Sequence, residues 1–290
     1  MRSLLFVPGD SLRKLEKGMG SAADVLLIDL EDSVALDAKA EARRITAAFL
    51  GERGRDTNRP RLYVRVNGLT TGLIDADLDG VMRSAPDGIV LPKTVGGADV
   101  AHLGAKLAVR EAEFGLDDGA TRILAIGTET AAGVFALGTF AGSSHRLMGL
   151  TWGGEDLSAD LGAETNRAED GAYTDPYRLA RSLTLLGAAA ASVDAIDSVF
   201  TNFRDMAGLE AECRTARRDG FLAKMAIHPA QVPVINQAFT PSPEAIERAQ
   251  AVIDAFKANP GAGVVGVNGE MLDRPHLLRA ERLLRRAGLL

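Results

Sequence analysis

Eight short apolar runs, each leading into a segment with helical character, constrain the fold of this chain more than any other feature. The runs cover residues 4–8, 25–29, 62–66, 88–91, 122–126, 146–150, 195–197 and 223–227. Strands that alternate with helices in this way are expected to be parallel and joined by helical crossovers. Because eight such units close into a barrel, we predict the α/β class and a (β/α)₈ TIM barrel.

An open, doubly wound sheet is the alternative to a closed barrel. That fold usually carries a glycine-rich nucleotide loop directly after its first strand. Here the corresponding segment, residues 8–11, contains one glycine. The sequence therefore favours the barrel.

The chain changes character at residue 241, where Pro241 and Pro243 interrupt the alternation. A helix is predicted over residues 243–259, with Ser242 as its N-cap. A short apolar run, an irregular polar segment over residues 268–276 and a basic helix follow. We therefore predict a barrel domain over residues 1–240 and a helical C-terminal extension over residues 241–290.

Composition limits the classes of partner. Of 290 residues, 46% are hydrophobic and 25% are charged, which is typical of a globular protein. The net charge of -6 gives no reason to expect nucleic acid or an anionic membrane. The single cysteine, Cys213, excludes an internal disulfide and suits a reducing compartment. No apolar run approaches the ~20 residues of a membrane span, and no signal peptide precedes the first strand, so we predict a cytoplasmic protein.

Two acidic residues stand where strands give way to loops. Glu129 follows the fifth apolar run, and Asp156 follows the sixth behind Gly153 and Gly154. In a parallel barrel these positions share the open face that carries the chemistry. Two adjacent glycines let backbone approach a ligand closely. Because Mg²⁺ selects one or two carboxylates and completes its shell with water, we predict Mg²⁺ at Glu129 and Asp156. Glu155 is an alternative to Asp156, and a surface acid without a role is the alternative for each.

More charge ends the second and fourth strands on the same predicted face. Asp29, Glu31 and Asp32 are three acids in four positions, and Lys93 follows the fourth strand. Such acids cannot all stay ionised without a cation or basic partners. We favour an outer shell that orients waters and basic neighbours over direct metal ligation.

Arg65 lies inside the third strand between two valines. A buried arginine requires an anion, and its planar fork suits a carboxylate. That anion is either a substrate carboxylate or one of the internal acids. In the tail, Asp273 by itself indicates no more than a loop acid. His228 ends the eighth strand and could shape the site through its backbone or its imidazole.

Eight motifs, taken in order, resemble the HpcH/HpaI aldolase and citrate lyase beta-subunit superfamily, most closely its CitE-like stand-alone lyases. They are Leu5-Phe-Val-Pro-Gly, Asp29-Leu-Glu-Asp, Arg65-Val-Asn, Leu91-Pro-Lys, Glu129-Thr, Gly153-Gly-Glu-Asp, Ile227-His-Pro and Met271-Leu-Asp-Arg-Pro-His. Each motif is weak alone, but the set spans nearly the whole chain in order.

The resemblance implies a (β/α)₈ barrel with a helical extension, assembled into trimers or hexamers in which the extension packs over the site of a neighbouring subunit. It implies Mg²⁺ at Glu129 and Asp156 and a substrate carboxylate at Arg65. It also implies that Asp273 is the catalytic acid or base.

The resemblance further implies where coenzyme A (CoA) would bind. The side chains of Phe6, Arg13 and Lys17 would contact CoA, together with backbone near Ile227 and His228. Phe6 departs from the tyrosine expected in some relatives, which puts a hydrogen bond from that position in doubt. Arg13 and Lys17 suit the phosphates of CoA.

The predicted reaction is the reversible cleavage of a 3-hydroxyacyl-CoA, citramalyl-CoA or malyl-CoA, to acetyl-CoA and pyruvate or glyoxylate. The alternatives are a citrate lyase beta subunit acting on an acyl-carrier thioester, a malyl-CoA thioesterase, an aldolase acting on free 2-oxo acids, and a non-catalytic metabolite-binding protein. Partner dependence and product analysis distinguish these alternatives.

Overall fold

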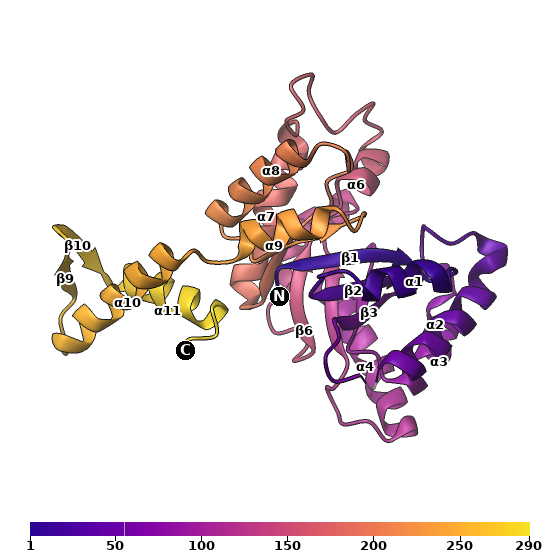
Figure 1. Cartoon of the computed structure of the whole chain (residues 1–290). Helices are drawn as coiled ribbons and strands as arrows, with labels where there is room; N and C mark the ends of the chain where they lie inside the picture. Colours follow the sequence, from indigo (N-terminus) through magenta and orange to yellow (C-terminus); the bar gives the residue numbers. More distant parts are fainter. Residues whose placement is uncertain (55) are drawn as a thin grey trace. The chain divides into compact units, whose positions relative to one another are not determined.

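The computed structural model describes residues 1–54 and 56–290. The chain divides into two compact units, Met1–Ala238 and Phe239–Leu290. The first unit runs from indigo to orange in Figure 1, and the second from orange to yellow. Among the described residues, no helix is long and apolar enough to cross a membrane.

The first unit is built on eight strands that close into a barrel in sequence order, with every neighbouring pair parallel. The strands are β1 (Ser3–Pro8), β2 (Val25–Asp29), β3 (Arg61–Arg65), β4 (Gly88–Leu91), β5 (Arg122–Ile126), β6 (Leu147–Thr151), β7 (Asp194–Asp197) and β8 (Ala223–Ala226). Pairing of β8 with β1 closes the circle, so the predicted barrel is confirmed over the open sheet.

The barrel interior is filled by side chains. Leu4, Leu27, Leu124 and Ile196 belong to one buried apolar cluster that also holds Tyr63. Gly88 makes room for that ring, since a Cβ at this position would lie 2.6 Å from the Tyr63 ring carbons. With its centre packed, the barrel leaves only its two ends for ligands.

The principal helices of this unit are α1 (Leu12–Met19), α2 (Lys39–Arg53), α3 (Ile74–Val81), α4 (Gly97–Phe114), α5 (Ala131–Phe135), α6 (Gly154–Leu161), α7 (Asp175–Ala191), α8 (Met206–Asp219) and α9 (Gln231–Phe239). In Figure 1, α1 to α4 lie outside the strands β1 to β3. Short 3₁₀ turns are η1 (Leu36–Ala38), η2 (Leu69–Thr71), η3 (Met82–Ser84) and η4 (Leu137–Phe140).

Three details differ from the expected helices. The sequence between the fifth and sixth apolar runs favours one helix over residues 132–141, but the structure splits it into α5 and η4, because the backbone at Ala136 leaves helical geometry, with φ -95° and ψ 2°. Helix α6 begins directly at Gly154 and was not predicted. Helix α9 follows β8 and was also not predicted.

The second unit holds α10 (Pro243–Ala258), a hairpin of β9 (Val264–Val267) and β10 (Glu270–Asp273), and α11 (Arg274–Arg286). Ser242 caps α10 through its hydroxyl, as predicted. The prediction of an irregular segment over residues 268–276 is wrong, because β10 pairs antiparallel with β9. Asn268 and Gly269 both have positive φ, as a two-residue hairpin turn requires.

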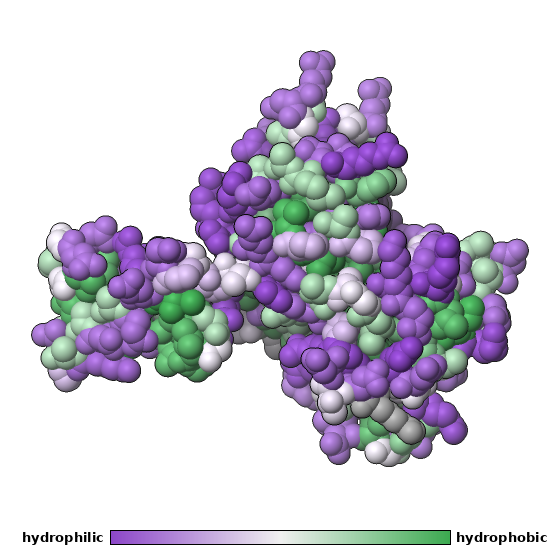
Figure 2. Space-filling view, viewed as in Figure 1, coloured by the Kyte–Doolittle hydropathy of each residue, from purple (hydrophilic) through white to green (hydrophobic). Residues whose placement is uncertain are grey.

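The second unit has its own small core, including Val252, Phe256 and Leu284. It also leaves apolar side chains in solvent. Figure 2 shows hydrophobic atoms on its surface, and Met271 is 77% exposed. A patch of this kind is typical of a surface that is covered in an assembly. The prediction that this extension packs on a neighbouring subunit stays a prediction.

Candidate active site

A cavity of about 330 Å³ lies at the carboxyl ends of the barrel strands. It is lined by Phe6, Pro8, Asp29, Ser33, Arg65, Ile126, Glu129, Trp152, Gly153, Gly154, Glu155, Asp156, Ser198, Val199, Met225 and Ile227. Apolar walls with a few converging charged groups are typical of small-molecule sites. The cavity therefore brings together residues that are far apart in the sequence but share one end of the barrel.

Glu129 is a buried acid of this cavity, with 3% exposure. Its carboxylate accepts a hydrogen bond from the backbone N–H of Lys93. Burial, with the nearby charges of Asp156 and Glu31, raises the pKa of Glu129 to about 8. Gly153 must lack a side chain here, because a Cβ would lie 2.7 Å from Glu129 Cγ.

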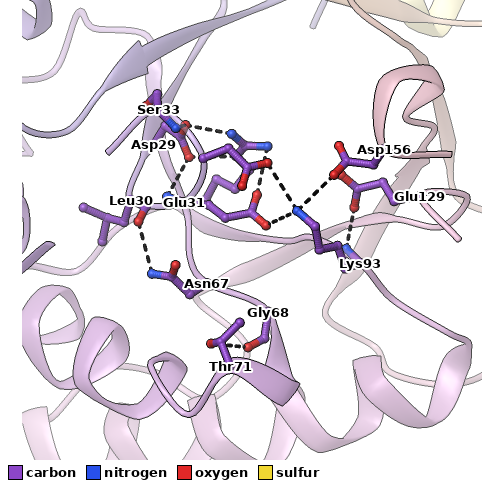
Figure 3. Close-up of polar contacts among 12 residues, drawn as sticks. Asp29, Leu30, Glu31, Ser33, Asn67, Gly68, Thr71, Lys93, Glu129 and Asp156 are labelled. Atoms are coloured by element: carbon purple, nitrogen blue, oxygen red, sulfur yellow. Dashed lines mark hydrogen bonds and ion pairs between the residues drawn. The ribbon is translucent and has the colours of Figure 1, made fainter. Parts of the chain in front are cut away.

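Asp156 faces the same space from the first turn of α6. Figure 3 shows its carboxylate beside that of Glu129, with Lys93 between these acids and Glu31. The Lys93 ammonium lies 3.2 Å from Asp156 Oδ1. The N-terminus of a helix favours a negative charge, which stabilises a carboxylate at this position.

Lys93 contacts two of the three acids of the predicted outer shell, Glu31 and Asp32. Its ammonium lies 2.5 Å from Glu31 Oε1 and 3.2 Å from Asp32 Oδ2. Its backbone is held at φ 53°, a left-handed conformation that costs free energy for a residue with a side chain. Against the effect of burial, the contact with Glu31 raises the pKa of Lys93, so the ammonium stays charged.

Arg65 pairs with internal acids, which is one of the two alternatives that its sequence position left open. Its Nε and Nη2 donate to the two oxygens of Asp29, both at 2.7 Å, and Nη1 lies 3.0 Å from Glu31 Oε2. The guanidinium also lies 4.9 Å from the centroid of the Phe6 ring. A guanidinium has five N–H donors, so these contacts leave capacity toward the cavity that it lines.

The donor set fits Mg²⁺ better than a metal that needs a complete protein cage. Among residues 1–54 and 56–290, no group of three or more His, Cys, Asp or Glu side chains is placed to hold a metal ion. Glu129 and Asp156 offer two carboxylates at an open cavity. Mg²⁺ is commonly held by one or two carboxylates, with water and ligand oxygens completing six positions. A cation here would also offset the burial that raises the pKa of Glu129.

The residues predicted to contact CoA divide into two groups. Phe6 and Ile227 line the cavity. His228 lies next to it and stacks on Phe203, with ring centroids 5.1 Å apart. Arg13 and Lys17 are exposed on α1 and do not line the cavity. Their separation from the cavity suits an extended ligand, and their role stays a prediction.

Asp273 belongs to the second unit, where it caps α11. Its Oδ1 lies 2.5 Å from His276 Nδ1, and this hydrogen bond lowers the pKa of the exposed carboxyl. A helix cap explains this geometry without any catalytic role. The catalytic assignment of Asp273 stays a prediction.

The sequence reasoning missed Trp152 and the charges behind it. Trp152 lines the cavity and is fully buried, and its indole N–H donates to Asp197 at 2.8 Å. Asp197 also lies 3.0 Å from the buried ammonium of Lys224. A signal was available, because Lys224 stands inside an apolar strand and must find an anion there.

Comparisons with known proteins agree with this geometry. The family model described as HpcH/HpaI aldolase/citrate lyase matches residues 2–229. The chain is 34% identical to citrate lyase subunit beta of Leuconostoc mesenteroides subsp. cremoris, over 99% of this chain and 93% of the relative. It is 36% identical to a (3S)-malyl-CoA thioesterase of Cereibacter sphaeroides, over 99% of this chain and 94% of the relative.

The chain also matches solved structures of relatives over nearly its whole length. The CitE protein of Mycobacterium tuberculosis in complex with magnesium, acetoacetate and coenzyme A is 34% identical, with a TM-score of 0.77 over 99% of this chain and 98% of that one. The same protein with magnesium and pyruvate matches with a TM-score of 0.72 and 32% identity, over 98% of each chain.

Proposed function

Because the chain belongs to the HpcH/HpaI aldolase and citrate lyase family, we propose that it is a Mg²⁺-dependent CoA-ester lyase. The reaction is the reversible cleavage of a 3-hydroxyacyl-CoA, citramalyl-CoA or malyl-CoA, to acetyl-CoA and a 2-oxo acid. The 2-oxo acid is pyruvate in the first case and glyoxylate in the second.

One observation carries the proposal. Glu129 and Asp156 come from successive strand ends and line one cavity together with Arg65. Two adjacent carboxylates suit a divalent cation, and a guanidinium suits a carboxylate group of the substrate. A 2-oxo acid needs both, because it carries a carboxylate next to a keto oxygen. A relative that matches nearly the whole chain was solved with magnesium and pyruvate, which supports this choice of ligand.

Each residue at the mouth of the barrel has a separate role in the proposed reaction. Glu129 and Asp156 hold the cation, and when bound there Mg²⁺ supplies Lewis-acid polarisation of the keto oxygen. Arg65 orients the substrate through a carboxylate, which fixes which carbon faces the thioester. Asp29 and Glu31 hold Arg65 in that orientation from the opposite side. Lys93 supports Glu31 and Asp32 at the rim.

The proton step is assigned to Asp273. In the condensing direction its carboxylate takes a proton from the acetyl methyl group, and the resulting carbanion bonds to the keto carbon while the carbon–oxygen π bond opens onto the oxygen, which takes up a proton from water. In cleavage the hydroxyl group gives its proton to water, the carbon–carbon bond breaks as the carbonyl re-forms, and the same carboxylic acid returns a proton to the departing carbon. The lowered pKa of exposed Asp273 makes it a weak base, so exclusion of water over the closed site must raise that pKa for the step to be efficient.

The proposed homo-oligomer, a trimer or hexamer, supplies that closure through the extension of a neighbouring subunit. Phe6 and Ile227 contact the acyl end of CoA, His228 lies beside them, and Arg13 and Lys17 bind the CoA phosphates. Exposed basic side chains on one helix suit a phosphate group.

An activity panel tests the proposal. The purified protein is incubated with acetyl-CoA or propionyl-CoA and either pyruvate or glyoxylate, with Mg²⁺ present or chelated. We expect condensation in at least one pairing and its loss on chelation. Activity that is indifferent to chelation refutes the metal assignment. The rates with the two acids show which 2-oxo acid the enzyme prefers.

Two relatives define the alternatives that the same panel separates. A malyl-CoA thioesterase converts malyl-CoA to malate and free CoA, whereas a lyase gives glyoxylate and acetyl-CoA. If the chain is instead a citrate lyase beta subunit acting on an acyl-carrier thioester, we expect its activity to depend on that carrier. The thioesterase matches 99% of this chain at 36% identity, so hydrolysis is measured alongside cleavage.

Subunit mixing tests the proton step. An Asp273→Asn variant and an Asp156→Asn variant are each expected to be nearly inactive. If the extension packs over the site of a neighbouring subunit, mixed oligomers of the two variants regain part of the activity. Some sites then combine the intact Asp156 of one chain with the intact Asp273 of its neighbour. Absence of any rescue, with subunit exchange shown by mass spectrometry, refutes a shared site.

A further inference from the structure

Behind the wall of the cavity, six side chains form a closed ring of contacts, here called the tryptophan ring. Its members are Trp152, Asp197, Lys224, Glu212, Arg167 and Tyr173. They come from the residue directly after β6, from β7, β8 and α8, and from the segment between α6 and α7. None of the roles assigned above uses any of them.

The first half of the ring is made of buried charges. The Trp152 indole N–H donates to Asp197 Oδ1 at 2.8 Å. The Lys224 ammonium donates to Asp197 Oδ2 at 3.0 Å and to Glu212 Oε1 at 2.7 Å. Trp152, Asp197 and Lys224 are each 0% exposed. Charges buried this deeply hold a fixed geometry, because any displacement leaves one of them without a partner.

The second half closes the ring through an arginine. The Arg167 guanidinium lies 3.2 Å from Glu212 Oε2 and 3.8 Å from the centroid of the Tyr173 ring. Tyr173 in turn packs edge-on against Trp152, with centroids 4.9 Å apart and an interplanar angle of 70°. Arg167 therefore joins the charged half of the ring to the aromatic half.

The ring touches the turn that presents the proposed metal ligand. Gly154 packs on Trp152, since a Cβ there would lie 3.2 Å from Trp152 Cζ3. Asn166, next to Arg167, donates to Glu155 Oε1 at 2.9 Å. The turn over residues 153–156 is thus fixed by the indole and by the same segment that carries Arg167. Asp156 is the last residue of that turn and has no hydrogen bond of its own to the ring.

We propose that the tryptophan ring positions the turn over residues 153–156, and that Arg167 is a positioning residue for Asp156. The part that concerns Asp156 rests on the proposed function. Outer groups that orient a metal ligand typically change metal affinity about 10–100-fold when they are removed. The ring supplies this orientation through packing and charge.

Arg167 is the member best suited to mutation. Its side chain is 22% exposed, so replacing it does not open a hole in the barrel core. Arg167→Met keeps the length of the side chain and removes the ion pair and the planar cation over Tyr173. Arg167→Lys keeps the charge near Glu212 but loses the planar stacking. Arg110→Met is the matched control, because Arg110 of α4 is 11% exposed, pairs with Asp79 of α3 at 2.6 Å and does not line the cavity.

Two readouts of the turn need no metal and no turnover. Trp152 is the only tryptophan of the chain, so acrylamide quenching of intrinsic fluorescence reports on its burial alone. Hydrogen exchange, followed by mass spectrometry, reports on the amides of residues 153–157. We expect Arg167→Met to increase both the quenching and the exchange, Arg167→Lys to have an intermediate effect, and Arg110→Met to match the wild type.

The third readout is the dissociation constant for Mn²⁺, used as a paramagnetic probe of the Mg²⁺ site. We expect it to rise about 10-fold or more in Arg167→Met, with a fall in kcat that raising the metal concentration partly restores. If quenching and exchange in Arg167→Met match those of the wild type, the proposal that the tryptophan ring positions the turn over residues 153–156 is refuted. Increased exchange with an unchanged Mn²⁺ dissociation constant overturns the positioning of Asp156. A wild-type protein that binds no Mn²⁺, combined with increased exchange in the variant, refutes the proposed metal site and supports the ring.

Discussion

Two charged clusters of the barrel unit differ in their balance of charge. The mouth cluster holds five acids and two basic side chains, namely Asp29, Glu31, Asp32, Glu129, Asp156, Arg65 and Lys93. The inner cluster holds three acids and three basic side chains, namely Asp197, Glu212, Asp219, Arg167, Arg181 and Lys224. The inner cluster joins β7 and β8 to α7, α8 and the segment before α7, and only in this cluster do the acidic and basic side chains balance in number.

The pKa directions follow this difference. At the mouth, Arg65 lowers the pKa of Asp29 against the effect of burial, but burial raises the pKa values of Glu129 and Glu31, so these two carboxylates lack enough positive charge nearby. In the inner cluster, Lys224 and Arg181 overcome the effect of burial and lower the pKa of Asp197. A balanced buried cluster is typical of a structural element, whereas a cluster short of positive charge suits a site that takes a cation. The difference supports the proposals that the mouth cluster binds ligand and that the inner cluster stabilises the fold.

The largest expected effect is the loss of turnover without loss of stability when Glu129 of the mouth cluster is replaced. Glu129→Gln removes a proposed metal ligand and should lower kcat about 10³-fold or more, since metal polarisation is worth several kcal/mol of barrier. Stability in urea should stay close to that of the wild type, because the raised pKa of Glu129 shows that its ionised form is disfavoured in the metal-free protein. Steady-state kinetics and urea unfolding measure the two quantities.

Asp79→Asn is the control for this variant, because Asp79 is 67% exposed and neutralises Arg110 on the outside of the barrel. It should leave turnover unchanged. A Glu129→Gln enzyme that keeps its turnover contradicts the assignment of the mouth cluster. One that is inactive because it unfolds contradicts the division of roles.

The next largest effect is a loss of stability when a residue of the inner cluster is replaced. Lys224→Met leaves Asp197 and Glu212 without their shared ammonium, and breaking such a buried pair typically costs about 3–5 kcal/mol of unfolding free energy. Urea denaturation measures the loss. Arg44→Met removes a cation from a solvent-exposed pair with Glu41 and should leave stability unchanged. A Lys224→Met protein as stable as the Arg44→Met control contradicts the structural role of the inner cluster.

The two clusters also mark how far sequence reasoning could go. Period and alternation predicted the closed barrel, since eight buried strands with helical crossovers leave few topologies. The acids at strand ends predicted the mouth, because parallel strands bring their carboxyl ends to one face. Glu129, Asp156 and Arg65 therefore met in one cavity as expected. The hairpin of the second unit was not predicted although Asn268-Gly269 is a strong turn signal, because the segment around that turn is short and polar.

The inner cluster could not be predicted because its members are joined by tertiary packing alone. Glu212 lies on an amphipathic helix, and Arg167 lies in an irregular segment between α6 and α7. Nothing in their local sequence indicates that Glu212 pairs with Lys224, or that Arg167 pairs with Glu212 and packs on Tyr173. Only Lys224, a basic residue inside an apolar strand, indicates from the sequence that a buried acidic partner must exist. The identity of that acid depends on the register of β7 and β8.

A third, smaller effect concerns added Mg²⁺. A cation that binds the folded mouth cluster stabilises the protein by about 2.7 kcal/mol when its concentration is 100 times the dissociation constant. Differential scanning calorimetry should show a higher Tm with Mg²⁺ in the wild type and in Lys224→Met, but no shift in Glu129→Gln. Equal shifts in all three proteins would place the cation outside the mouth cluster.

The smallest expected effect tests the border between the clusters, where Glu155 and Asp156 are neighbours with different partners. Asp156 contacts Lys93 of the mouth, whereas Glu155 accepts a hydrogen bond from Asn166 beside Arg167. Glu155→Gln keeps an oxygen that can accept from Asn166, so the change in Mn²⁺ affinity should stay within the factor of about 10 that one ordinary hydrogen bond allows.

Asp156→Asn removes a proposed ligand and should abolish measurable Mn²⁺ binding. Titration of both variants with Mn²⁺, followed by electron paramagnetic resonance, decides which of the two adjacent acids faces the cation. If Glu155→Gln loses binding and Asp156→Asn keeps it, the ligand is the acid attached to the inner cluster. The separation of a cation-binding mouth from a self-balanced interior would then fail at the residue where the two clusters meet, because one side chain would serve both.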